Sequence, residues 1–163
     1  MTSMDKTART DLNKASGTGT GTSTGKSLAP SLIAACGMNC GLCSAYHRER
    51  NQCPGCNGED VKKPYHCQKC SIKHCRNIQD SQSKRCYECE AFPCARMKQL
   101  DKRYRTKYKM SMVENLLHIK NDGMDHFIVN ENIKWRCENC GGIICVHTGA
   151  CVSCKIERRY GNE

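Results

Sequence analysis

The 163-residue chain has few large apolar side chains and no long hydrophobic run. One Trp and two Phe are present, and the hydrophobic fraction of 38% includes the cysteines. A β/α barrel needs runs of Val, Ile and Leu for its buried strands, so we do not expect a barrel enzyme. A membrane span needs about 20 apolar residues, so we also expect no membrane partner. A chain with so little material for an apolar core needs disulfides or metal ions to fold.

The sequence also lacks the features of an exported protein. It has no apolar h-region of a secretory signal. The run LIAACG, which contains Cys36, is too short for a lipoprotein signal, and Pro30 and Ser31 precede it. We therefore expect a cytoplasmic protein, in which thiols stay reduced and C-x2-C pairs indicate metal ligands.

Residues 1–30 are rich in Gly, Ser and Thr, which predicts a disordered tail. The segment TGTSTGKS resembles a phosphate-binding loop, but Thr20 stands where G-x4-G-K-S requires its first Gly. No strand is predicted before this segment. We therefore expect no nucleotide site in the tail.

Sixteen cysteines dominate what the chain does contain, and twelve of them form six C-x2-C pairs. Two such pairs place four sulfurs about 2.3 Å from one tetrahedral zinc ion, so six pairs in a short chain are a specific signal. CQKCSIKHC and CYECEAFPC share the spacing C-x2-C-x4-C, which indicates a repeated ligand unit. The ligands predicted in a cysteine-rich domain over residues 31–110 are Cys36, Cys40, Cys43, Cys53, Cys56, Cys67, Cys70, Cys75, Cys86, Cys89 and Cys94.

The spacing leaves the pairing of these eleven cysteines open. One arrangement has three sites, which are Cys40, Cys43, Cys53 and Cys56; Cys67, Cys70, Cys86 and Cys89; and Cys36, Cys75 and Cys94 with a histidine. We take His74 as that fourth ligand, and His66 is the alternative.

The C-terminal residues 135–163 predict a zinc ribbon. CENC and CVSC are separated by ten residues, which predicts one site with the ligands Cys137, Cys140, Cys151 and Cys154. The segment IICVHTGA between them predicts a hairpin arm that closes at Thr148 and Gly149. Cys145 and His147 lie on this arm, and we expect them to pack beside the site without binding the metal.

Three helices are predicted between the metal regions. Pro93 and the apolar residues that follow at spacings of three and four predict a helix over residues 94–109. Ser111 with Glu114 forms a capping box for a second helix, which Gly123 ends, and Met124 begins a third. We expect residues 111–134 to form a helical clamp between the metal regions. The predicted fold class is a small metal-stabilised α+β protein with an irregular multi-zinc domain, a helical middle and the ribbon.

These motifs resemble a family of small microbial cysteine-rich proteins of unknown function. The matching segments are CGMNCGLC, CPGC, CYECEAFPC and CENCGGIICVHTGACVSC, so the resemblance covers about residues 35–155. It implies metal binding, presumed to be zinc, and it implies no particular activity.

We therefore predict a multi-zinc protein with about four zinc ions, no catalytic residue and a structural or interaction role. A closed four-ligand site has no open position at which a water molecule could be activated. One alternative is an iron–sulfur redox protein that uses Cys36, Cys40 and Cys43, because clusters accept varied cysteine spacings. The other is a nucleic-acid-binding zinc protein.

The formal charge of +10 and the basic predicted helix 94–109 suggest a nucleic-acid or protein partner. That charge treats every cysteine as neutral. Four zinc ions held by fifteen thiolates would lower it to about +3. Only a local basic face then remains, so we expect nucleic-acid binding to be weak and sensitive to salt.

Overall fold

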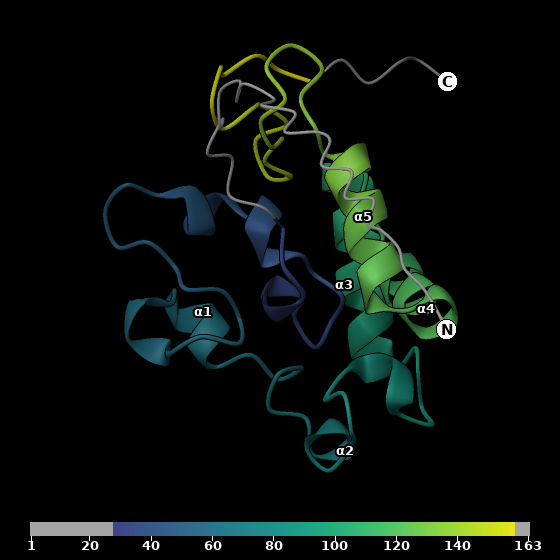
Figure 1. Ribbon diagram of the computed structural model, residues 1–163. Helices are drawn as coiled ribbons and strands as arrows, with labels where there is room; N and C mark the ends of the chain where they lie inside the picture. The colour runs from purple at the N-terminus through teal and green to yellow at the C-terminus, as the bar shows by residue number, and fades with distance from the viewer. Residues whose placement is uncertain (1–27, 159–163) are drawn as a thin grey trace, which may run out of the picture.

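A computed structural model of the chain describes residues 28–158, and these residues form a helix-rich structure. The longest elements are α3 (Ala95–Tyr108), α4 (Met112–Asp122) and α5 (Met124–Lys134). They lie together on one side of the molecule, and the cysteine-rich segment loops over the other side (Figure 1). The single-turn helices α1 (Tyr65–Gln68) and α2 (Arg76–Gln79) belong to that segment. Most of the predicted tail, residues 1–27, lies outside the described residues.

The three long helices begin and end close to where the sequence predicts. α3 begins at Ala95 after Cys94, so Pro93 stands before the helix and not within its first turn, and its bond to Phe92 is cis. The Ser111 hydroxyl accepts a hydrogen bond from the Glu114 N–H at 3.0 Å, which confirms the predicted cap of α4.

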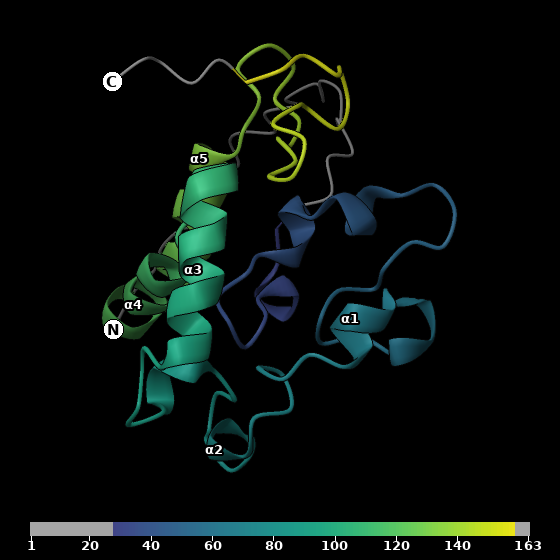
Figure 2. The same ribbon diagram turned by 180° about the vertical axis from the view of Figure 1, so that it is seen from behind.

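The connection from α3 to α4 is held by a buried carboxylate. Asp101 accepts a hydrogen bond from the Ser111 hydroxyl at 2.8 Å and another from the Val113 N–H at 3.0 Å. The view from behind shows α3 in front of α4 and α5 (Figure 2). α4 and α5 are joined at Gly123, whose φ of +89° lies in the region that favours glycine.

β-structure in residues 28–158 is limited to isolated antiparallel bridges. Three of the four lie in the C-terminal segment and join Arg136 to Ile143, Ile144 to Cys151 and Ala150 to Glu157. The chain turns at both cysteine pairs, so too few residues remain between the turns for a regular strand. The α+β part of the predicted fold class is therefore not confirmed.

One hydrophobic core joins the N-terminal segment, the long helices and the C-terminal segment. Its most deeply buried side chains include Ile33, Leu42, Met97, Met112, Leu116, Phe127, Trp135 and Val146. Buried polar bonds tie the same parts together: Asn39 donates to Glu131 of α5 at 3.2 Å, and Asn115 of α4 donates to the Gly37 carbonyl at 2.9 Å. Leu28 also packs into this core.

Candidate metal centre

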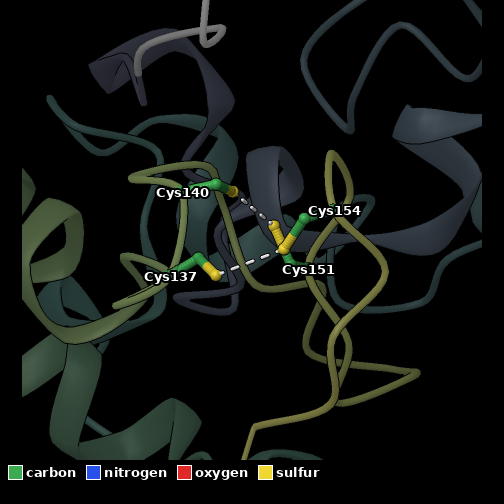
Figure 3. Close-up of side chains that lie close together, drawn as sticks. All are labelled: Cys137, Cys140, Cys151 and Cys154. Carbon is green, nitrogen blue, oxygen red and sulfur yellow. Dashed lines mark hydrogen bonds between the residues drawn. The ribbon is translucent and has the colours of Figure 1, made fainter.

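Four cysteines of the C-terminal segment converge on one point. The thiol sulfurs of Cys137, Cys140, Cys151 and Cys154 all lie within 4.8 Å of one another. The Cys137–Cys154 sulfurs are 3.7 Å apart and the Cys140–Cys151 sulfurs 3.5 Å apart (Figure 3). Four sulfurs about 2.3 Å from a tetrahedral zinc ion are about 4 Å from each other, so the spacing fits a single ion. This group can hold a metal ion.

Two similar turns bring the four sulfurs together. After the first pair, the Gly141 N–H donates to the Cys137 carbonyl at 2.8 Å, and after the second the Lys155 N–H donates to the Cys151 carbonyl at 3.0 Å. Both residues that follow a pair have positive φ, +73° at Gly141 and +63° at Lys155. A Cβ at Gly142 would lie 2.8 Å from the Ser153 hydroxyl, so the two turns approach closely there.

The electrostatics of this group favour a cation. The Ile156 N–H, as the main cause, lowers the pKa of Cys154 to about 6. The Gly142 N–H acts in the same direction on Cys140, but the neighbouring thiols of Cys154 and Cys151 outweigh it and raise that pKa to about 12. Four thiolates at this spacing repel one another, and a divalent ion compensates their charge.

The eleven cysteines predicted as ligands between Cys36 and Cys94 are arranged differently. Within residues 28–158, no three of their sulfurs lie within 4.8 Å of one another. Individual cysteines of this region still contact each other. The Cys56 N–H donates a hydrogen bond to the Cys40 sulfur at 3.2 Å. Hydrogen bonding with Cys40, together with burial, raises the pKa of Cys56 well above its usual range. The ligand role of the eleven stays a prediction.

Burial favours the protonated form of two of these thiols. Burial raises the pKa of Cys36 to about 12, and the nearby Cys56 thiol adds to the shift. Burial also raises the pKa of Cys86 to about 12, with further contributions from the thiols of Cys94 and Cys75. A bound cation would reverse these shifts, because it favours the thiolate.

The two histidines considered as a twelfth ligand are both exposed. The ring of His74 contacts the Gln68 carbonyl through Nε2 at 2.9 Å. His66 lies on α1. The choice between them stays a prediction.

Lys63 is a site residue that the sequence reasoning missed. Its side chain is fully buried, and its ammonium group donates to the carbonyls of Cys56 and Gly58 at 2.8 and 2.5 Å. It also pairs with Asp60 at 2.8 Å, so it fastens the turn that follows the CPGC motif. Lys63 lies in a polar stretch, and no pattern in that stretch distinguishes it from its exposed neighbours.

The tip of the C-terminal segment contacts the CGMNCGLC motif directly. Val146 donates to the Leu42 carbonyl at 2.9 Å, and the Ser44 N–H donates to Nδ1 of His147 at 3.2 Å. The Tyr104 hydroxyl of α3 lies 3.1 Å from Nε2 of the same ring. Cys145 is buried, and its sulfur is not part of the four-cysteine group. His147 therefore supports the contact between the two regions, and not the C-terminal group as the sequence suggested.

The basic face predicted for residues 94–109 is present on α3. Arg105 lies 3.8 Å from Asp101 and 3.6 Å from Glu114, and Arg96 donates to the Ser71 carbonyl. The other basic side chains of the helix are exposed, namely Lys98, Lys102, Arg103 and Lys107. A protein or nucleic-acid partner for this face stays a prediction. None of the helices between residues 28 and 158 has the length and apolar character needed to cross a membrane.

Comparisons with known proteins add one finding. A search of curated proteins and a search of solved structures found no match. The model of a family described as "Protein of unknown function (DUF3795)" matches residues 32–99, which include CGMNCGLC, CPGC and CYECEAFPC. The resemblance seen in the sequence is confirmed, although the match ends before the four-cysteine group. Over residues 32–99 the chain is thus similar to this family of unknown function, and the C-terminal group that can hold a metal ion lies outside the matched residues.

Proposed function

We propose that the chain is a non-catalytic zinc protein in which Cys137, Cys140, Cys151 and Cys154 bind one structural zinc ion. One observation carries the proposal, which is the convergence of four sulfurs within 4.8 Å on two similar turns. Four protein ligands complete the tetrahedron of zinc, so no position remains for a reacting water molecule. The ion then stabilises the fold and supports a structural or interaction role.

A zinc ion in this site would maintain the structure of the C-terminal segment and the contacts of that segment with the N-terminal region. The segment is held by turns and isolated bridges, so little of its own structure would persist without the metal. Structural zinc binding supplies on the order of 10 kcal/mol of folding energy to units of this size. Since Val146 and His147 lie at the tip, the ion also keeps the contacts to Leu42 and Ser44 in place.

For the cysteines between Cys36 and Cys94 we propose three further zinc ions, which gives about four per chain. The proposal rests on the C-x2-C spacing and on the closeness of pairs such as Cys40 and Cys56. The unit that repeats C-x2-C-x4-C is the strongest part of this pattern.

For the cysteines between Cys36 and Cys94, one observation favours an iron–sulfur cluster as a second candidate. Its sulfurs form no group of three within 4.8 Å in the described chain, whereas thiolates on one zinc ion lie about 4 Å apart. The cysteines of an iron–sulfur cluster bind different iron atoms and stand farther apart. A cluster held by Cys36, Cys40 and Cys43 with a fourth ligand is therefore the alternative occupant.

Metal analysis of full-length protein purified without oxygen tests both candidates. If zinc occupies all sites, the protein is colourless and contains about four zinc ions and no acid-labile sulfide. One zinc with near-equal iron and sulfide, in a brown protein that bleaches on reduction, would assign a cluster to the N-terminal region. A folded protein that contains no metal would overturn the proposed function.

A further inference from the structure

The corner between α4 and α5 holds a second group of potential metal ligands, and this group contains no cysteine. His118, Asp122 and His126 offer ligand atoms that all lie within 4.8 Å of one another. His118 and Asp122 are one turn apart on α4. The chain reverses at Gly123, so His126 in the first turn of α5 returns to the same side.

Three polar groups lie close to Nε2 of the His118 ring, and one ring nitrogen cannot form good hydrogen bonds with all of them at once. Its Nε2 lies 3.4 Å from Nδ1 of His126, 3.5 Å from the Asp122 carboxylate and 3.1 Å from the Asn130 amide nitrogen. An imidazole nitrogen carries either one N–H or one lone pair, so it forms one good hydrogen bond at a time. A cation at the centre would instead accept lone pairs from both rings and from the carboxylate together.

Packing already orients these side chains. The His118 ring stands edge-on to Phe127 at 5.5 Å and 90°, and it lies 5.5 Å from the His126 ring at 74°. Phe127 is buried, so it holds the His118 ring from the core side. The side chains of His118 and Asp122 are 28% and 53% exposed, so an ion can reach them from solvent.

We propose that His118, Asp122 and His126 bind a divalent transition-metal ion such as zinc at the α4–α5 corner. Imidazole and carboxylate ligands suit zinc, nickel and copper, and three protein ligands leave a position for water. The ion joins the last turn of α4 to the first turn of α5. This site is separate from the thiolate sites and does not rest on the proposed function.

Equilibrium dialysis against zinc at pH 7.5 tests the site. Full-length protein with its thiolate metal already bound should take up one further zinc per chain. His118→Ala and His126→Ala should each abolish this uptake, and Asp122→Asn should weaken it at least about tenfold. The matched control is Asp125→Asn, the same chemical change beside His126, and it should leave the uptake unchanged.

Acid should also release this ion from the wild type. Protons compete with a metal ion for its ligand atoms, so lowering the pH from 7.5 to 5.5 should lose most of the uptake. Thiolate-bound metal and circular dichroism are measured in every variant to show that each one is folded. Equal uptake by the His118→Ala/His126→Ala double variant would overturn the proposal. So would the absence of any further uptake by the wild type at millimolar zinc.

Discussion

The two cysteine-rich regions of this molecule differ in how they bring their thiols together. Ten residues separate Cys140 from Cys151, and two similar turns point all four C-terminal sulfurs at one position. The N-terminal region spreads eleven cysteines over residues 36–94, across single-turn helices and loops. Its cysteines contact one another singly, as where the Cys56 N–H donates to the Cys40 sulfur, but within residues 28–158 no three of its sulfurs form a group. Ligands that are near in sequence are placed by local turns, whereas distant ligands depend on tertiary contacts.

The regions also differ in the protonation of their thiols. A backbone N–H lowers the pKa of Cys154 to about 6, while burial raises the pKa of Cys36 and of Cys86 to about 12. The hydrogen bond from the Ile156 N–H thus favours the thiolate form of Cys154 even before any cation binds. Burial favours the protonated form of Cys36 and Cys86, so a metal that binds these two thiols must displace their protons.

Breaking the C-terminal group should have the largest effect. Cys137→Ser or Cys151→Ser should remove one metal ion per chain, because each removes a ligand from a closed site. The expected loss is on the order of 10 kcal/mol of metal-dependent folding energy for residues 135–158. Metal analysis and hydrogen exchange of this segment measure it.

Cys145→Ser is the matched control, since Cys145 is buried in the same segment but lies outside the four-sulfur group. It should keep the ion and destabilise the protein only mildly. If it removes the ion as completely as Cys151→Ser does, Cys145 is a ligand and the assignment of the group is wrong.

Leu42→Ala tests whether the two regions unfold together. Leu42 is fully buried, and its carbonyl receives the bond from Val146. The cavity should lower the free energy of unfolding by about 2–5 kcal/mol. A single, lower thermal transition would indicate that both regions form one cooperative unit with the helices. Leu117→Ala, at a site 40% exposed on α4, should cost about 0.5 kcal/mol or less. Two separate transitions in Leu42→Ala would show that the regions fold independently.

Asn39→Ala addresses the link between the N-terminal segment and α5. It removes a donor to Glu131 and an acceptor of the Gly41 N–H, which should cost about 1–3 kcal/mol. Burial raises the pKa of Glu131 above its usual value, and the Asn39 amide opposes that shift by favouring the carboxylate. Without Asn39, ionised Glu131 is less stable, so the loss should be larger at pH 8 than at pH 5. Denaturant unfolding of metal-saturated protein across this range measures it. An equal loss at both values would show that Glu131 is not the group involved.

Asp60→Asn should have the smallest effect, and it should be confined to the N-terminal region. Lys63 and Lys73 lower the pKa of Asp60 to about 2, so its contribution is complete above the unfolded value of about 4 and is lost as pH falls toward 2. Asp60→Asn should therefore lower the hydrogen-exchange protection of the amides near Lys63. The loss of protection should be the same at pH 8 and at pH 5. Glu59→Gln is the control one residue away. Loss of the C-terminal ion in Asp60→Asn would show that the effect is not confined to the N-terminal region.

The sequence was informative where structure depends on near neighbours. The cap at Ser111 and the end of α4 at Gly123 were predicted because each depends on residues within a few positions of one another. The four-cysteine group was predicted because it consists of two C-x2-C pairs that only ten residues separate. The regular strands expected of the ribbon did not form in the described residues, since short segments between tight turns leave room only for isolated bridges.

Contacts between distant segments were decided by the tertiary structure alone. The burial of Lys63, the bond from Asn39 to Glu131 and the place of His147 against Ser44 join residues that no spacing rule relates. The corner of His118, Asp122 and His126 is intermediate, because the four-residue spacing is visible in the sequence but its closure depends on the reversal at Gly123. Residue types and local turns thus determined that the C-terminal thiols form a group that can hold a metal ion. Which thiols meet, and how the two regions support each other, was decided by burial against α3, α4 and α5, because only packing brings distant parts of the chain into contact.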